Sequence, residues 1–361
     1  MTLRLFNPEH DIALAANLSN FTAPHAARQL RRDLGFLPVL WANQGDAVLV
    51  DDVVSSYKSL QKTAVALKRY CGVSLPDIGD MLIDKLGDKT PTTVSPWGWD
   101  KALKAQLIRN GVKEDILPTD NQLDIVRTLS HRRTSSVVLA HLQMEGTVGE
   151  SHECTTVAGV EAYVKTCNMT VLKAPWSSSG RGLRFVARQE EGRLLPSVAG
   201  WVRNIISTQG CVMVEPYYNK VKDFGMEFVA HGDGHVSYEG LSLFHTANGA
   251  YKGNILATES WKLASLGAFV PTEFICKIKD WLCRELERCL AGRYTGPLGV
   301  DMMVVADAGR ECYLLHPCVE INLRRTMGHV ALAISPTDDD IQSVMRIALI
   351  DNIYKLTISR L

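Results

Sequence analysis

The most informative part of this 361-residue chain is the stretch VLKAPWSSSGRGLRFV, residues 171–186. Apolar and β-branched residues at its two ends predict short strands at Val171–Lys173 and Leu183–Ala187. The first strand ends in Lys173, and a loop of serine and glycine follows. Such a loop can fold over phosphates, because glycine lets backbone N–H groups point inward and serine hydroxyls add donors. A plain surface hairpin has the same composition, so this stretch alone leaves both interpretations open.

Two better-known nucleotide motifs are excluded. The chain contains no Gly-Lys dipeptide, so it has no Walker A sequence. The Gly180-Arg181-Gly182 segment lacks a third glycine at the required spacing and leads into a predicted strand rather than a helix. This argues against a dinucleotide fingerprint.

A second informative segment lies near residue 320. Alternation along a predicted strand places Glu320, Asn322 and Arg324 on one face. Two oxygen ligands and a guanidinium group suit magnesium bound to nucleotide phosphates, because Mg²⁺ is held by one or two carboxylates plus phosphate oxygens. Asp301, on the preceding predicted strand, could supply another carboxylate. The solvated face of a half-exposed strand would explain the same residues.

The pairing of Asp301 depends on the geometry of this hairpin. A simple hairpin would place Asp301 opposite Leu315 rather than opposite Glu320. Pro317 interrupts the second strand, and a bulge there would bring the two carboxylates together. Without a bulge, carboxylates nearer the turn are the alternative ligands, namely Asp307 and Glu311.

The third segment is Val214-Glu215-Pro216-Tyr217, where a predicted strand runs into an extended turn. Because Pro216 limits ladder pairing, backbone groups here could read the edge of an adenine ring. A strand that ends in a surface glutamate is the ordinary alternative.

The order and spacing of the three segments resemble the ATP-grasp superfamily. In that family a lysine strand and a small-residue loop precede a hinge of this form, and a late strand pair carries the metal ligands. The helix predicted after Trp99-Asp100-Lys101 also resembles the family's first lysine helix. The resemblance covers roughly residues 95 to 330 and implies ATP and Mg²⁺ as cofactors.

The resemblance also implies a role for particular residues. The nucleotide contacts would be Lys101 and Lys173 at the phosphates, the closing loop with Ser177, Ser178, Ser179, Gly180 and Gly182, Glu215 and Tyr217 at the adenine, and Glu227 at the ribose. The metal ligands would be Asp301, Glu320 and Asn322, and the catalytic cations would be Arg324 and Arg181.

The N-terminal ninety residues alternate between predicted strands and helices, which is typical of a parallel α/β layer. We therefore expect an α/β fold with a Rossmann-like N-terminal domain at residues 1–95. Residues 96–361 would form the ATP-grasp domain of two α+β subdomains, with a small lid subdomain at about 130–215. Three further elements are expected, namely strands at Val39–Ala42 and Thr134–Leu142 and a final helix from Pro336 to Leu361.

The sequence gives weaker indications of which residues contact the acceptor substrate. The segment Asn7-Pro8-Glu9-His10-Asp11 follows the first strand, at the edge where α/β sheets bind ligands, so His10 is a possible substrate contact or base. Arg325 is a possible contact for a carboxylate. Ordinary turn chemistry explains both residues as well. The run His131-Arg132-Arg133 is interpreted as a solvated surface segment.

Composition limits the classes of partner. Lys plus Arg number 39, and Asp plus Glu also number 39, so the formal net charge is zero. This composition shows no excess of positive charge of the kind that binds nucleic acid or an anionic membrane. No stretch approaches the roughly 20 apolar residues of a membrane span, and Met1–Phe6 lacks the apolar core of a signal peptide. The nine cysteines show no zinc-type spacing, which indicates free thiols in a reducing cytoplasm. We expect a cytoplasmic protein with small-molecule partners, and a homodimer is one option for its assembly.

The function that the resemblance implies is a carboxylate–amine ligase. Such an enzyme transfers the γ-phosphoryl group of ATP to a carboxylate, and an amine or another nucleophile attacks the acylphosphate. A kinase on the same scaffold and a non-catalytic nucleotide-binding module remain alternatives.

Overall fold

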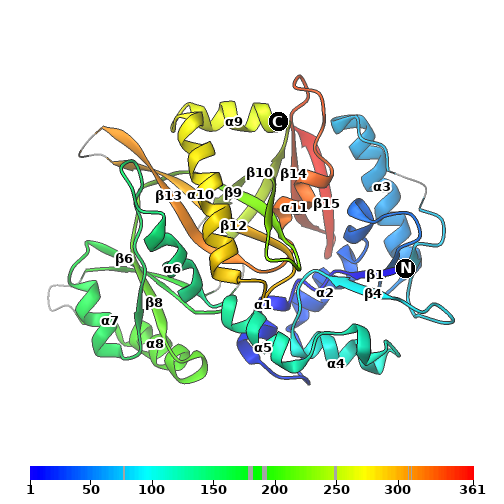
Figure 1. The fold of residues 1–361 in the computed structure, drawn as a ribbon, viewed down its shortest axis with the longest axis horizontal. Coiled ribbons are helices and arrows are strands. Elements are labelled where there is room, and N and C mark those ends of the chain that lie inside the picture. Colours follow the sequence, from blue (N-terminus) through cyan, green and yellow to red (C-terminus); the bar gives the residue numbers. More distant parts are fainter. Residues whose placement is uncertain (76–77, 178–181, 189–192, 248–249, 308, 310) are drawn as a thin grey trace.

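The computed structural model describes residues 1–75, 78–177, 182–188, 193–247, 250–307, 309 and 311–361 (Figure 1). Its N-terminal part is a four-stranded parallel sheet in the order β3-β2-β1-β4. The strands are β1 (Thr2–Leu5), β2 (Ala47–Leu49), β3 (Leu82–Ile83) and β4 (Thr93–Pro96). Its helices include α1 (His10–Ala16), α2 (His25–Leu34), α3 (Val53–Cys71) and α4 (Lys101–Arg109). The predicted parallel α/β layer is confirmed.

A seven-stranded antiparallel sheet forms the centre of the molecule, in the order β13-β12-β9-β10-β11-β14-β15. The strands are β9 (Lys220–Ala230), β10 (Val236–Ala247), β11 (Ala250–Leu256), β12 (Gly296–Asp307), β13 (Cys312–Asn322), β14 (Ser343–Ile350) and β15 (Ile353–Arg360). Along β9, Phe224, Met226 and Phe228 are buried in a core shared with the helices α6 (Arg132–His141) and α10 (Thr272–Leu290). Because side chains alternate along a strand, Asp223 and Glu227 face the opposite side, which is free for a site.

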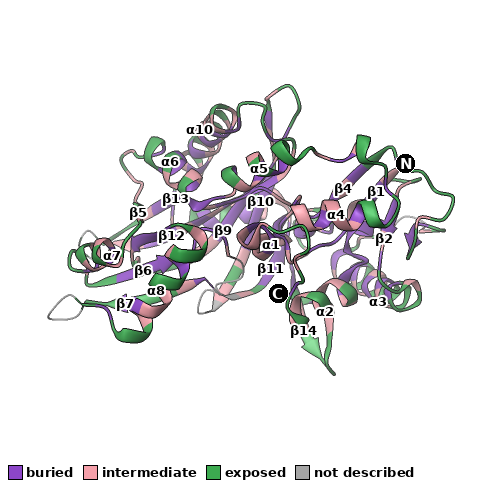
Figure 2. Ribbon diagram, turned by 90° about the horizontal axis from the view of Figure 1, so that it is seen from below, coloured by how far each residue is buried: buried purple, intermediate pink, exposed green. Residues whose placement is uncertain are grey.

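A third sheet is antiparallel and four-stranded, in the order β5-β8-β6-β7. Its strands are β5 (His152–Cys154), β6 (Met169–Lys173), β7 (Leu183–Ala187) and β8 (Val212–Pro216), and it is covered by α7 (Val157–Val164) and α8 (Pro196–Gln209). Two α+β layers therefore follow the parallel sheet, as the fold class predicts. The buried residues concentrate in the strands of the sheets, and the exposed ones on the outer sides of the helices (Figure 2).

Two expected strands are wrong. Residues Leu37–Trp41 form the 3-10 helix η1, with Pro38 in its first turn, where its fixed φ is tolerated. The expected strand at 134–142 is the helix α6, whose buried Ser135, Val138 and Leu139 follow a helical spacing. His131 caps this helix by accepting a hydrogen bond from the Arg133 N–H at 2.9 Å.

The expected final helix is also wrong, because residues 343–360 form the hairpin β14–β15. Asp351 and Asn352, between the two strands, have φ values of 54° and 59°. Two consecutive residues with positive φ match the twist of a tight hairpin turn, and Asp and Asn tolerate this conformation. Short apolar runs such as this one fit a strand and a helix equally well.

The hairpin β14–β15 packs against the N-terminal layer, on the side of α2 and α3 (Figure 1). The Tyr354 N–H donates to the Asp33 carboxylate at 2.9 Å, and Phe6 and Trp97 share one core with Met345. The remaining elements are η2 (Glu114–Ile116), α5 (Asp120–Leu129), α9 (Glu259–Gly267) and α11 (Met327–Ala333). The domain boundary near residue 95 and the lid at 130–215 stay predictions, as does a homodimer. In the described part of the chain, no helix combines the length and apolarity needed to cross a bilayer.

Candidate active site

The two predicted metal-binding strands meet in the register that the site requires. Asp301 on β12 lies directly opposite Glu320 on β13, and Gly299 lies opposite Asn322. The pairing shifts between Asp301 and Met303, where Met302 alone faces three residues of β13, 317–319. The bulge near Pro317 is thereby confirmed. Because directly opposed residues point to the same side of a sheet, both carboxylates and the amide share one face.

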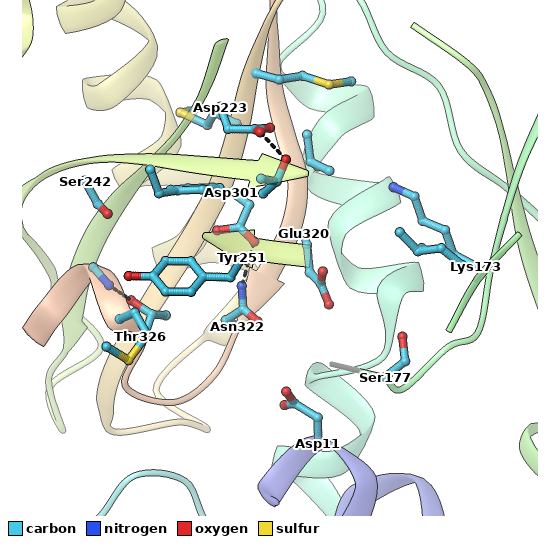
Figure 3. Close-up of a pocket in the computed structure, with 18 of the residues that line it drawn as sticks. Asp11, Lys173, Ser177, Asp223, Ser242, Tyr251, Asp301, Glu320, Asn322 and Thr326 are labelled. Carbon is cyan, nitrogen blue, oxygen red and sulfur yellow. Dashed lines mark hydrogen bonds between the residues drawn. The ribbon is translucent and has the colours of Figure 1, made fainter. Parts of the chain in front are cut away.

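This face opens onto a cavity of about 900 Å³. Lys173 and Glu215 line it from the β5-β8-β6-β7 sheet, Ser177 lines it from the segment after β6, and Asp301 and Glu320 line it from the central sheet. Lys173 and Ser177 stand across the cavity from the carboxylates (Figure 3). Its size is that of a small-molecule or cofactor site. The lysine strand and the carboxylate strands thus converge on one space.

The oxygen donors are crowded: Asn322 is buried, and Asp301 and Glu320 are half-buried. Burial, followed by the charges of Glu320 and Glu227, raises the pKa of Asp301 to about 8. The Asn322 amide donates to Asp301 at 3.3 Å, and its oxygen accepts from Arg324 at 2.8 Å. Among the described residues, no three His, Cys, Asp or Glu side chains group to hold a metal ion. Two carboxylates and an amide oxygen nevertheless match Mg²⁺, which takes its other ligands from phosphates and water.

Lys173 is buried and forms an ion pair with Glu215, with 2.5 Å between Nζ and Oε2. Tyr217 lies at the rim, half exposed, with its ring 6.0 Å from that of Phe185. The Tyr217 N–H donates to the Met169 carbonyl at 2.9 Å, so this backbone donor is not free for an adenine edge. The assignments of Glu215 and Tyr217 to the adenine stay predictions.

Arg132 is a site residue that the sequence interpretation missed. It stands at the first position of α6, and its guanidinium contacts Glu320 Oε2 at 2.9 Å. The same group donates to the Ala174 carbonyl at 3.0 Å and to the Ser177 hydroxyl at 3.3 Å. Arg132 therefore connects the start of the serine loop to the metal-binding strand. The helical spacing of the buried residues in α6 was the signal that could have placed it.

Arg324 forms a bidentate pair with Asp11, with both N–O distances at 2.9 Å. Burial disfavours the ionised form of Asp11, but the charge and hydrogen bonds of Arg324 outweigh burial and lower its pKa. Asp11 lies on α1, next to the candidate His10, and lines the cavity. In the segment that follows β1, Pro8 and Asp11 therefore line the cavity, and His10 does not.

Three candidate residues lie away from the cavity. His10 is buried with its Nδ1 3.4 Å from Asp100, beneath Gly98, where even a Cβ atom would clash with the ring. The guanidinium of Arg325 packs over the ring of Trp41, at 4.8 Å. Lys101 forms an ion pair with an exposed partner on α5 at 2.7 Å, and its assignment to the phosphates stays a prediction.

Two remaining predictions concern the loop and the ribose. Ser178, Ser179, Gly180 and Arg181 lie outside the described residues. At its described ends the loop is narrow, because the Gly182 carbonyl accepts from the Ala174 N–H and a Cβ at Gly182 would overlap Ser177. Glu227 lines the cavity, but its carboxylate already lies 2.8 Å from Thr326 Oγ1 and 2.9 Å from His329 Nδ1. Its assignment to the ribose stays a prediction.

No family model and no curated protein matches the chain. Solved structures with a similar fold exist, and three of them follow. N5-carboxyaminoimidazole synthetase from Staphylococcus aureus, complexed with ADP, has 12% identity and a TM-score of 0.43 over 71% of this chain and 65% of that chain. The biotin carboxylase domain of Hydrogenobacter thermophilus 2-oxoglutarate carboxylase, with MgADP, has 13% identity and a TM-score of 0.47 over 83% and 64%. Biotin carboxylase from Campylobacter jejuni, in an ATP complex, has 10% identity and a TM-score of 0.47 over 96% and 75%. The chain spans just under two thirds of the length of the first two.

Proposed function

We propose that this chain is an ATP-grasp enzyme that binds ATP with magnesium in the cavity and uses it to activate a carboxylate. The observation that carries the proposal is the convergence of Lys173 with Asp301 and Glu320 on one cavity. A cationic flank and an oxygen-donor flank on either side of one space suit a triphosphate that is neutralised from both sides.

The end of the cavity beside the β5-β8-β6-β7 sheet suits the nucleotide. We call it the nucleotide arm. Its apolar side chains are Met169, Val171, Leu183, Phe185, Met303 and Val319. A planar base can lie between such walls, while Lys173 and Ser177 supply donors for phosphate oxygens.

Asp301, Glu320 and Asn322 would hold the magnesium ion, which neutralises charge as the γ-phosphoryl group moves. Arg132 contacts Glu320, and Arg324 contacts Asn322, so the two guanidinium groups flank the ligands. Both are held by several partners and need no rearrangement to stabilise developing charge. Arg324 therefore keeps its proposed catalytic role, and Arg132 joins it.

The chemistry is a transfer in two steps. A carboxylate oxygen of the acceptor forms a bond to the γ-phosphorus, and the bond from that phosphorus to the β-bridging oxygen breaks, which releases ADP. An amine nitrogen then bonds to the acyl carbon, the acyl carbon–oxygen bond breaks, and phosphate leaves while the amine proton passes to solvent. The protein contributes positioning and charge stabilisation.

The test measures ADP and phosphate release by the full chain with MgATP and pools of carboxylic acids and amines. Acid-dependent ADP release, with hydroxylamine trapping of an acyl hydroxamate, is the expected result. A stable phosphorylated product would instead identify a kinase. Nucleotide binding without turnover across the whole pool would identify a binding module, and no binding of MgATP or MgADP would overturn the proposal.

A further inference from the structure

The lining of the cavity also includes residues of α2, α11 and the β14–β15 hairpin. These elements lie on the side of the molecule away from the β5-β8-β6-β7 sheet (Figure 1). We call this region the acceptor arm. Its wall is defined here by six side chains from the N-terminal layer, α11 and the C-terminal hairpin, namely Phe6, Leu30, Trp97, Met327, Ile347 and Tyr354. All six are apolar or aromatic.

This wall is firmly supported. The rings of Phe6 and Trp97 pack edge to face, with 4.9 Å between their centroids. The ring centroid of Trp41 lies 6.4 Å from that of Trp97. Tyr354 is held to α2 through its N–H, which donates to Asp33. The wall belongs to a core cluster that joins both ends of the described chain. Its aromatic edges therefore present a preformed surface to whatever binds there.

The charges that line the cavity are already matched. Among its described lining residues, each cation has an acidic partner, in the pairs Arg132–Glu320, Lys173–Glu215, Lys220–Asp223 and Arg324–Asp11. The acidic Asp301 and Glu227 line the cavity in addition to these pairs. A second anionic group on the acceptor, such as a phosphate, would lose its hydration and meet no unpaired cation among these residues.

We propose that the acceptor arm binds the ring of an aromatic carboxylic acid that carries no charged group besides its carboxylate, and that this carboxylate points toward Arg324 and the proposed metal ligands. This inference rests on the proposed function and adds the class of acceptor. Aromatic rings favour the edges of Phe6, Trp97 and Tyr354, and burying the ring removes apolar surface from water. Small hydrophilic acids would leave the wall uncovered, and phosphorylated acids would bring an unmatched charge.

The test uses the full chain with MgATP and three sets of acids: aryl acids such as phenylacetate, a phosphorylated acid such as 3-phosphoglycerate, and bicarbonate. We expect aryl acids to stimulate ADP release at least tenfold more than the other two. Ile347→Lys should raise the KM for aryl acids at least tenfold and leave the Kd of MgADP unchanged. Ile347→Ala removes apolar volume from the wall without adding a charge, so it should raise the KM for aryl acids by a smaller factor. The matched control is Leu349→Lys, an exposed position on the same strand, which should change neither value.

Binding is measured separately, by the quenching of tryptophan fluorescence and by thermal shift in the presence of MgADP. If MgADP binds but bicarbonate or the phosphorylated acid is preferred, or if no aryl acid binds, the acceptor inference is overturned and the nucleotide proposal stands. If MgADP itself fails to bind, the proposed function fails. Aryl acids that still shift the melting temperature of the wild type, but not of Ile347→Lys, would then support the arm alone.

Discussion

The nucleotide arm and the acceptor arm are built from opposite kinds of interaction. In the nucleotide arm, charged groups are buried against each other, as in the pair of Lys173 and Glu215 and in the contacts of Arg132. In the acceptor arm, rings and aliphatic side chains form the wall. Removing one member of a buried ion pair is costly, whereas an apolar wall tolerates exchange of one hydrophobic side chain for another of similar volume. Under the proposed function, chemistry and selectivity would therefore reside in separate parts of one cavity.

The largest expected effect comes from Glu320→Gln, which keeps the shape of the side chain and removes its charge. We expect turnover to fall by about 100-fold to 1,000-fold, because the magnesium ligand and the partner of Arg132 are lost together. ADP release with a fixed acceptor measures this. The Kd of an acid for the acceptor arm should stay within twofold, and a large change there would contradict the separation of the two arms.

The next effect concerns Arg132. In Arg132→Met the helix and its packing are kept, but the link between Ser177 and Glu320 is broken. We expect turnover to fall by about 10-fold to 100-fold. Arg133→Met is the matched control, because Arg133 is exposed and pairs with Glu153 at the surface, where an ion pair contributes little. Equal losses in the two variants would remove Arg132 from the site.

The bidentate pair of Asp11 and Arg324 spans 313 residues of the chain and lies between the two arms. Asp11→Asn leaves the buried guanidinium without its carboxylate. We expect the free energy of unfolding in urea to fall by about 1–3 kcal/mol. Asp124→Asn removes the exposed partner of Lys101 and should cost no more than about 1 kcal/mol. Comparable losses would show that the Arg324 pair adds no special stability.

The last effect is a dependence of stability on pH, and it arises from two buried histidines. His131 packs against Trp176 and His316 against Tyr218, and burial lowers the pKa of each histidine to about 4. The unfolded chain takes up these protons near pH 6.5, so their stabilisation is complete above pH 6.5 and is lost as the pH falls toward 4. Urea unfolding should lose up to about 2 kcal/mol per histidine between pH 6.5 and 5. His316→Leu should weaken this dependence, and an unchanged slope would contradict it.

Much of the nucleotide side was predictable because its signals are local. The alternation at Glu320 and Asn322, the proline that marks the bulge, and the lysine before the serine loop are each readable within a few residues. The roles of Arg132 and Asp11 were not readable, because each depends on a partner that only the folded chain brings near. Lys101 depends on tertiary structure in the same way, since the sequence did not reveal its ion pair with Asp124 on α5.

The acceptor arm could not be predicted from any motif. Its wall draws on the N-terminal layer, α11 and the β14–β15 hairpin, and the hairpin was expected to be a helix. Apolar residues such as Ile347 and Tyr354 carry no chemical signature, so only tertiary packing reveals that they share a surface with Phe6 and Trp97.

The bulge between β12 and β13 restricts which insertions and deletions the chain can accept in this segment. Because side chains alternate with a period of two, loss of one codon within 317–319 would rotate Glu320 and Asn322 away from the cavity. Substitutions there alter a single contact, whereas a one-residue deletion would displace two proposed metal ligands at once. We therefore expect descendants of this chain to tolerate changes of identity in the segment far better than changes of its length.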